Sequence, residues 1–181
     1  QTGSGGASLA AVKFIRESMI EKGIKASYAL GGITAHMVKM HEEGLIKRLI
    51  DVQSFDKVAA ESVKNNEFHK EVSASEYAAA DEQGSATHYL DIVILSALEV
   101  DVDFNVNVLV GSDGIIRGAI GGHPDTAADS ALSIIVCPLL RGRIPCVVDK
   151  VTTLITPGAT VDVVVTEYGI AVNPRRPEVA E

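Results

Sequence analysis

Short apolar segments alternate with amphipathic segments through the first half of the chain, and this alternation most constrains the fold. Leu9, Val12, Ile15 and Met19 share one helical face, and Gly23 follows where a helix commonly ends. The alternation continues with expected strands at residues 25–32 and 45–52 and expected helices at residues 33–44 and 54–66. Parallel neighbouring strands need crossovers, which helices usually supply. The pattern predicts an α/β fold with an open, mostly parallel sheet flanked by helices.

The second half is richer in strands. Residues 91–111 and 115–122 are rich in β-branched side chains, and the sequence GSDG between them predicts a glycine-rich β-hairpin. Further strands are expected at residues 132–140, 151–157 and 160–171. We expect residues 1–172 to form one domain and residues 173–181, which contain two prolines and alternating charges, to form a surface tail.

Composition disfavours several classes of function. The chain has 16 basic and 24 acidic side chains, a formal net charge of −8, and no basic block that would follow a nucleic-acid backbone. It has no signal peptide and no apolar run long enough to span a membrane, so we expect a cytoplasmic protein with no membrane partner. Cys137 and Cys146 are expected as reduced core residues. His36 and His41 lie five residues apart, the wrong spacing for a shared metal, so no metal site is expected.

Two glycine-rich segments place backbone amides just before a helix, at residues 2–8 and 118–131. Glycine permits close backbone approach, and helix N-termini present N–H groups to anions, so either segment could bind a phosphate or an oxyanion. The alternative is that they are only a helix cap and a turn. The first is not a dinucleotide fingerprint, because Gly3 and Gly5 are followed by Ser8 where a third glycine is required.

Three further side chains could have chemical roles, two of them in the second segment and Glu167 near the end of the chain. His123 stands between a glycine pair and Pro124, where we expect the turn to direct its ring outward, and a general acid–base role is open to it. Glu167 ends an apolar run and is expected to accept hydrogen bonds from backbone amides. Asp125 is expected as the N-cap of the helix that follows.

Four separated segments together resemble one family. The sequences QTGSGGASLAA, EVD, GGHPD and TEYGIA occur in the order seen in the acetyl-CoA hydrolase and CoA-transferase superfamily, and the resemblance is greatest to the citrate lyase alpha subunits. It covers essentially all 181 residues. It implies a CoA-transferase-like domain that forms the carboxy-terminal half of a longer subunit. In the family two similar α/β domains pack together with the active site between them, so an amino-terminal half would be missing here.

The resemblance also implies a reaction and its partners. Citrate lyase alpha subunits exchange acetyl for citryl on the thiol of a CoA-like prosthetic group, carried by an acyl carrier (gamma) subunit, and release acetate. A lyase (beta) subunit then cleaves the citryl thioester. The expected ligands are therefore acetyl and citryl thioesters and citrate, with no metal.

The expected site residues follow from the same resemblance. Relatives that work covalently use a glutamate whose place falls at about Gly31, yet no carboxylate occurs between Ala26 and Met40, so the resemblance implies attack by the acceptor acid itself. Glycine there is expected to leave room for substrate. Arg117 is the nearest cation for a citrate carboxylate, or else a solvated hairpin charge. The expected catalytic residues are Gly31, Gly32 and His123, and the expected substrate-binding residues are Gly121, Gly122 and Arg117.

Two alternatives remain open. One is a covalent acyl-CoA hydrolase or carboxylate CoA-transferase of the same superfamily, with Glu76 as its nucleophile. The other is a non-catalytic module that docks the acyl carrier or assembles the complex. Because an active site between two domains cannot be complete in one of them, the isolated chain is expected to be inactive.

Overall fold

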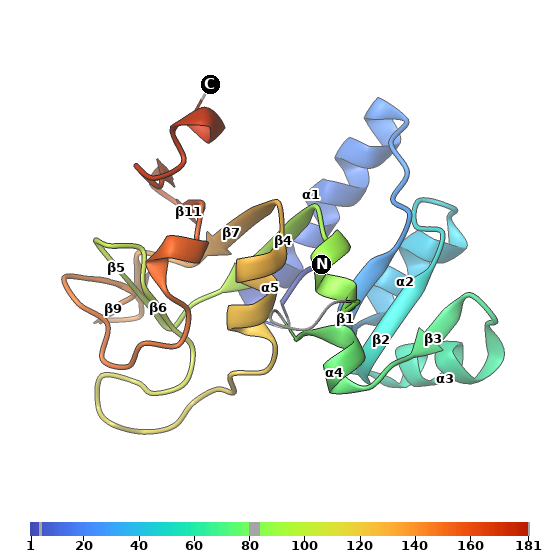
Figure 1. Ribbon diagram of the computed structural model, residues 1–181, viewed down its shortest axis with the longest axis horizontal. Helices are drawn as coiled ribbons and strands as arrows, with labels where there is room; N and C mark the ends of the chain where they lie inside the picture. The colour runs from blue at the N-terminus through green and yellow to red at the C-terminus, as the bar shows by residue number, and fades with distance from the viewer. Residues whose placement is uncertain (4, 80–83, 181) are drawn as a thin grey trace. The chain divides into compact units, whose positions relative to one another are not determined.

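The computed structural model describes residues 1–3, 5–79 and 84–180. The chain divides into two compact units, Gln1–His88 and Tyr89–Glu181, and each is described by itself. Both contain helices and parallel strands (Figure 1), as the sequence predicts; the sheet of unit 1 is parallel throughout, and unit 2 has parallel and antiparallel pairs. No helix among the described residues is long and apolar enough to cross a membrane.

Unit 1 is an alternating α/β unit. Its order is α1 (Gly6–Lys22), β1 (Ala29–Ile33), α2 (Ala35–Glu42), β2 (Leu49–Ser54), α3 (Lys57–Asn65), β3 (His69–Glu71) and α4 (Ala74–Tyr77), with a 3₁₀ turn at Ala86–Tyr89. The sheet order is β1-β2-β3, and both pairs are parallel. Gly23 and Gly44 follow α1 and α2 with φ of 63° and 72°, left-handed values that glycine adopts readily and that end a helix.

The core of unit 1 is aliphatic. It is built from Val12 of α1, side chains of β1 and β2, three side chains of α2, and Ala59 of α3. Leu30, Ile33 and Leu49 are fully buried. This packing holds the carboxyl end of β1 beside the amino end of α2.

Unit 2 contains short strands and one helix. Its elements are β4 (Ile92–Ser96), β5 (Glu99–Asp101), β6 (Val106–Asn107), α5 (His123–Asp129), β7 (Leu132–Val136), β8 (Leu140–Arg141), β9 (Ile144–Pro145), β10 (Val147–Val148), β11 (Val163–Thr166) and β12 (Gly169–Val172), with 3₁₀ turns at Gly158–Thr160 and Pro177–Ala180. The main sheet has the order β12-β11-β7-β4, in which only β12 is antiparallel to its neighbour. The helix α5 connects the parallel strands β4 and β7.

Three expected strands of unit 2 differ from the prediction. The glycine-rich hairpin is a tight reversal closed by one antiparallel bridge, between Val110 and Ile116, and residues 117–122 form no strand. Residues 151–157 are not a strand: Thr156 makes a single bridge to Val106. Residues 160–171 hold two strands that pair as a hairpin instead of one long strand. β-Branched residues favour buried extended backbone, and they do not determine whether it pairs in a ladder.

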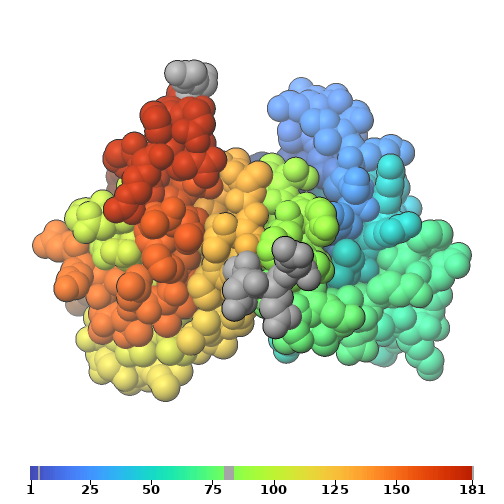
Figure 2. All heavy atoms as spheres, viewed as in Figure 1, coloured from blue at the N-terminus to red at the C-terminus, as the bar shows by residue number. Residues whose placement is uncertain are grey.

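The last residues begin inside unit 2 and end on its surface. Asn173 is buried, and its amide donates to the carbonyls of Gly158 at 2.8 Å and Val161 at 2.6 Å. Arg176 pairs with the buried carboxylate of Asp162 at 2.5 Å. Figure 2 shows the segment beyond them, in red, at the surface. The expected tail is therefore anchored at its start.

Asp56 joins two helices of unit 1, and its removal should be measurable. Its carboxylate accepts from the amide of Ala59 at 2.9 Å, as the N-cap of α3, and from the amide of Ala35 at 2.7 Å, at the start of α2. We expect Asp56→Ala to lower the free energy of unfolding by about 2 kcal/mol, because two helix amides lose their acceptor. Asp56→Asn, which keeps an oxygen, should lose less than half as much in urea titrations. Equal losses in the two variants would contradict this role.

Candidate functional site

Both units place a glycine pair where a parallel strand ends and a helix begins, the edge of an α/β sheet at which ligands usually bind. In unit 1 the pair is Gly31 and Gly32 of β1, which leads into α2. In unit 2 the pair is Gly121 and Gly122, before α5, whose first residue is bonded to the last residue of β4. The expected site residues thus fall into two groups, one in each unit. That the two groups meet in one site stays a prediction.

The backbone of Gly31 is irregular and lies under a side chain. Its φ is 103°, and the register with β2 shifts between Gly31 and Gly32. A Cβ added at position 31 would lie 2.9 Å from Cδ, 3.0 Å from Oε1 and 3.1 Å from Nε2 of Gln1. The space expected to be open to substrate is therefore filled by the Gln1 carboxamide, and the expectation of open room there is wrong.

The Gln1 carboxamide is held from a second direction. Its Nε2 donates to the hydroxyl of Tyr77 at 2.8 Å, and Tyr77 is a buried residue of α4. At Gly32 a Cβ would lie 1.7 Å from a ring carbon of Phe55. The two glycines are thus needed for close packing of side chains over the end of β1, a contact between segments distant in sequence that no local pattern reveals.

Two buried hydroxyls flank this contact in sequence. Thr2 follows Gln1, and Thr34 stands at the N-cap position of α2 without capping it. They are 8% and 7% exposed, and neither Oγ1 has a hydrogen-bond partner among the described residues. Buried hydroxyls are almost always bonded, so Thr34, directly after β1, and Thr2, directly after Gln1, each have an unused donor and acceptor. Sequence reasoning missed both threonines, since isolated threonines carry no signal.

The turn before α5 exposes backbone amides. Gly118 is required for close packing, because a Cβ there would lie 2.1 Å from the carbonyl oxygen of Val108. Gly121 has a φ of 51°, and Gly122 is the N-cap of α5. Within the part of the chain that the structure describes, the amides of Gly121 and Gly122 donate to no backbone carbonyl. The turn can therefore offer two N–H groups to an oxygen atom of a ligand.

His123 points inward, so the expectation of an outward ring is wrong. Its Nε2 lies 3.1 Å from the carbonyl oxygen of Ser96, and its Nδ1 lies 2.6 Å from the hydroxyl of Thr156. A carbonyl only accepts, so Nε2 carries the proton and Nδ1 accepts from Thr156. Burial lowers the pKa of His123 to about 4. A neutral ring with both nitrogens bonded fixes the turn to β4, while the catalytic role of His123 stays a prediction.

The low pKa of His123 predicts how stability depends on pH. The folded chain keeps the ring neutral, whereas the unfolded chain takes up a proton below an ordinary pKa of about 6.5, so stability falls as pH falls from there toward the folded pKa of about 4. We expect this residue to remove about 2 kcal/mol of unfolding free energy between pH 7.5 and pH 5. His123→Gln should lose that part of the pH dependence in urea titrations, and the exposed control His36→Gln should keep it. An unchanged pH dependence in His123→Gln would contradict the assignment.

Arg117 is already paired. Its guanidinium contacts the carboxylate of Asp113 in the same reversal, and both side chains are partly exposed. The backbone amide of Ile115, together with Arg117, lowers the pKa of Asp113. This pairing favours the reading of Arg117 as a solvated hairpin charge, and a role in binding citrate stays a prediction.

The other expected carboxylates are structural. Glu167 accepts from the backbone amide of Leu139 at 2.9 Å, which confirms the predicted acceptor role. Asp125 is not the N-cap of α5: the helix begins at His123, and Asp125 lies in its first turn because Pro124 can occupy the first helical positions. Glu76 forms a capping box with Ser73 at the start of α4, and the backbone and hydroxyl of Ser73 lower its pKa.

Both cysteines are buried and free, as predicted. Burial raises the pKa of Cys137 to about 11 and also raises that of Cys146, so neither thiol is a ready nucleophile. Within residues 1–3, 5–79 and 84–180, no cluster of histidine, cysteine or carboxylate side chains could hold a metal ion.

The sequence EVD supplies two buried carboxylates that hold loops. Glu99 accepts from the side-chain amide of Asn107 at 2.9 Å and from the backbone and hydroxyl of Thr152 at 2.8 and 2.9 Å. Asp101 accepts from two backbone amides of the following turn, and from the amide of Val151 at 3.2 Å. These bonds hold residues 151–157 in place without a strand ladder.

A buried polar network in unit 1 was not expected. His69 lies 3.2 Å from Asp51 and 2.9 Å from the hydroxyl of Ser62, and the ring and carboxylate are almost fully buried. Burial lowers the pKa of His69. A carboxylate, a histidine and a serine hydroxyl in this order also occur in serine hydrolases. Here the histidine ring and the carboxylate are closed to solvent, and Ser62 lies within α3, so a substrate has no access to the ring and the carboxylate. The network therefore connects α3 to β2 and β3.

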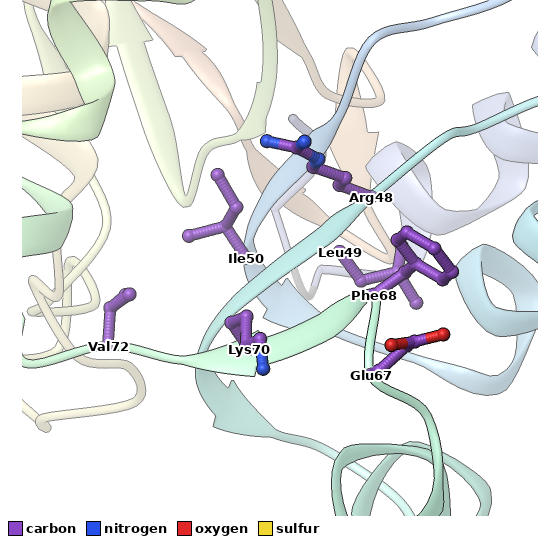
Figure 3. A pocket seen from close by; sticks show the side chains of 7 residues that line it. All are labelled: Arg48, Leu49, Ile50, Glu67, Phe68, Lys70 and Val72. Carbon is purple, nitrogen blue, oxygen red and sulfur yellow. The ribbon is translucent and has the colours of Figure 1, made fainter.

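A hollow of about 360 Å³ lies along β2 and β3. Figure 3 shows its lining, which is mostly apolar and comes from β2, β3 and the residues beside them: Arg48, Leu49, Ile50, Glu67, Phe68, Lys70 and Val72. Arg48 and Phe68 precede the amino ends of their strands. None of the expected site residues is in this lining, so we place the candidate site at the glycine pairs instead.

Solved structures of low sequence identity share this fold. RipA from Yersinia pestis matches with a TM-score of 0.66 and 15% identity, over 95% of this chain and 40% of its own. The alpha subunit of a malonate decarboxylase from Acinetobacter baumannii matches with a TM-score of 0.69 and 13% identity, over 94% of this chain and 40% of its own. The chain has the mixed α/β, CoA-transferase-like fold.

The sequence comparisons identify the family of the chain. A family described as "Citrate lyase, alpha subunit (CitF)" matches residues 1–181, so the chain belongs to that family. It is 61% identical to the citrate lyase alpha chain of Escherichia coli (strain K12) and 57% identical to that of Klebsiella pneumoniae, over all of this chain and 36% of theirs. The solved alpha subunit of citrate lyase from Streptococcus mutans, in complex with citrate, matches with a TM-score of 0.95 and 58% identity, over 99% of this chain and 35% of its own.

The shares of length correct one expectation. The chain spans about a third of the length of these relatives, 36% for the two curated proteins, and not the expected half. The shares give no position along the longer protein, so the expected carboxy-terminal placement is not confirmed by them.

Proposed function

We propose that the longer subunit containing this chain is a citrate CoA-transferase, which exchanges acetyl for citryl on a CoA-like thiol of an acyl carrier subunit in the cytoplasm. Family membership supports the reaction, and the citrate bound by the Streptococcus mutans relative supports the acceptor. The observation that carries the noncovalent route is at Gly31, where the backbone is bare and a neutral carboxamide, not a carboxylate, lies over it.

The exchange can then proceed between the bound reactants. A carboxylate oxygen of citrate attacks the acetyl carbonyl carbon, the C–S bond breaks, and the thiolate leaves with the electron pair. The thiolate next attacks the citryl carbonyl of the mixed anhydride, and acetate leaves. Bringing reactants into attack geometry lowers such barriers by about 7 to 11 kcal/mol, and each oxyanion donor adds about 3 kcal/mol. The amides of Gly121 and Gly122 are suited to that second role.

The covalent alternative has weaker support. Glu76 would be its nucleophile. The carboxylate of Glu76 already accepts hydrogen bonds from the backbone amide and the hydroxyl of Ser73, as part of the capping box of α4. The docking alternative is supported by the length of the chain. About two thirds of the length of the relatives has no counterpart in these 181 residues. Under our proposal that remaining polypeptide completes the site, and the gamma and beta subunits are partners.

An assay of the full-length subunit with its acyl carrier tests the proposal. Acyl exchange from the acetylated carrier is measured with a panel of acids: citrate, citramalate, other di- and tricarboxylates, and water alone. We expect exchange with citrate to exceed thioester hydrolysis by at least 100-fold. Hydrolysis without exchange would support the hydrolase alternative, and the absence of both reactions would support the docking module.

A further inference from the structure

The hairpin of β8 and β9 lies at the carboxyl ends of the parallel strands of unit 2. It follows β7 closely in sequence, and its register pairs Arg141 with Ile144 across a two-residue turn. The amide of Leu139, just before the hairpin, donates at 2.9 Å to the carboxylate of Glu167, which directly follows β11. The hairpin is therefore at the edge of the sheet at which α/β proteins usually bind their ligands.

The side chain of Arg141 reaches the end of the third parallel strand, β4. Its Nη2 donates to the carbonyl oxygen of Ala97 at 2.9 Å, and Ala97 directly follows Ser96, the last residue of β4. The carbonyl of Ser96 in turn lies 3.1 Å from Nε2 of His123. Consecutive Cα atoms are about 3.8 Å apart, so the guanidinium and the imidazole are bound to neighbouring residues. Arg141 and the turn that precedes His123 are thus held at the same end of β4.

The charge of Arg141 is not used by a carboxylate of this chain. Among the described residues, the ion pairs of arginines are made by Arg16, Arg117 and Arg176, and none includes Arg141. A guanidinium has five N–H donors, and the bond to Ala97 uses one of them. Arg141 is exposed, so a ligand can reach the others. A planar guanidinium binds a carboxylate through two parallel hydrogen bonds, which makes this group suited to hold one carboxylate of a substrate.

The chemistry of the exchange decides which carboxylate is suited to Arg141. The carboxylate that attacks the thioester gives up its negative charge as it forms the anhydride. A cation bound to it would stabilise it before the attack and so raise the barrier. A second carboxylate of a di- or tricarboxylic acid does not react, and it keeps its charge throughout. A cation can hold that second carboxylate in the ground state and in the transition state alike.

We propose that Arg141 binds a carboxylate of the acceptor acid that does not take part in the attack, and thereby selects di- and tricarboxylic acids over monocarboxylic acids. This inference rests on the proposed function and adds to it the residue that recognises the acid. It gives Arg141 the role that was expected of Arg117, whose charge is paired with Asp113. It predicts that loss of the Arg141 charge weakens the use of citrate and leaves unchanged the use of acetate, which has a single carboxylate.

The test compares two acceptors in the full-length subunit in its complex, with the acetylated carrier as donor. One acceptor is citrate, and the other is isotopically labelled acetate, whose incorporation into the carrier thioester is measured. We expect Arg141→Gln to lower kcat/KM for citrate by about 10- to 100-fold, the effect of one hydrogen-bonded charge, and to keep kcat/KM for acetate within about 3-fold of the wild type. Glutamine keeps an N–H that can donate to Ala97, so the variant removes the charge with little change to the hairpin.

Two further variants control for charge and for folding. Arg143→Gln is the matched control, because Arg143 is an exposed arginine of the same hairpin that makes no ion pair among the described residues, and it should behave as the wild type. Arg141→Lys keeps the charge without the two parallel donors, and we expect a loss of about 3- to 10-fold for citrate. It replaces Arg141→Gln if that variant shows no cooperative urea transition.

The outcomes separate this inference from the proposed function. An equal loss for citrate and acetate in Arg141→Gln, an unchanged kcat/KM for citrate, or an equal loss in Arg143→Gln overturns the inference. If exchange of acetate is too slow to measure in the wild type, calorimetry of citrate binding replaces it, with a Kd about 10- to 100-fold weaker expected in Arg141→Gln and an unchanged Kd overturning the inference. A wild-type enzyme that exchanges acetate but not citrate would instead overturn the proposed function.

Discussion

We expect the isolated 181-residue chain to catalyse acyl exchange at least 1000-fold more slowly than the full-length subunit. The chain spans about a third of its relatives' length, and its candidate groups are backbone amides, hydroxyls and one carboxamide. Under the proposed function such groups bind and orient reactants but do not react, so the rate is expected to depend on a complete enclosure of both reactants. Removing two thirds of the polypeptide removes most of that enclosure.

The measurement is acetate release from the acetylated carrier in the presence of citrate. Far-UV circular dichroism and a cooperative urea transition serve as the control that the isolated chain is folded. Adding the remaining polypeptide in trans should restore exchange. Turnover by the folded chain within 10-fold of the full subunit would show that these residues contain a complete site.

The second large effect is expected from Glu99→Ala. Glu99 is 4% exposed, and its carboxylate is the acceptor for Asn107 and for two groups of Thr152. Alanine removes three hydrogen bonds to a buried carboxylate, one from the buried side chain of Asn107 and two from the exposed Thr152, so we expect the free energy of unfolding to fall by about 3 kcal/mol. The effect should appear in urea titrations of the 181-residue chain.

Two variants control for this result. Glu99→Gln keeps the shape and one acceptor oxygen, and it should lose less than the alanine variant. Glu42→Ala removes an exposed glutamate at the end of α2 and should change stability by less than about 0.5 kcal/mol. A loss below about 1 kcal/mol in Glu99→Ala would show that residues 151–157 do not depend on this carboxylate.

The elements of unit 1 were predictable because local signals agree there. Apolar spacing along α1 and the glycines after α1 and α2 locate the helices, and the alternation of strands and helices predicts the parallel sheet. In unit 2 the β-branched residues at 151–157 resemble a strand, but hydrogen bonds that their amides donate to Glu99 and Asp101 hold this segment as irregular structure. Such long-range bonds leave no periodic trace in the sequence.

The candidate site was predictable in its glycines and not in its side chains. Gly31 and Gly32 of the first pair, and Gly118 before the second, lie where the backbone approaches other atoms closely, whereas a Cβ at Gly121 would meet nothing within 4 Å. The space over Gly31 is filled by Gln1, which lies thirty positions earlier in the sequence. Gln1 is held there by Tyr77 of α4, which lies more than forty positions later. The orientation of His123 was likewise set by Ser96 and Thr156, both far from it in sequence.

The central claim is that residues 1–181 supply no covalent nucleophile and that the acceptor acid attacks the thioester directly. The most direct measurement is intact mass and peptide mapping of the full-length subunit after incubation with acetyl-CoA or the acetylated carrier, followed by borohydride reduction. The account predicts an unmodified mass for every peptide from these 181 residues. A glutamate or aspartate in them that carries a CoA thioester, or is reduced to the alcohol, would contradict it.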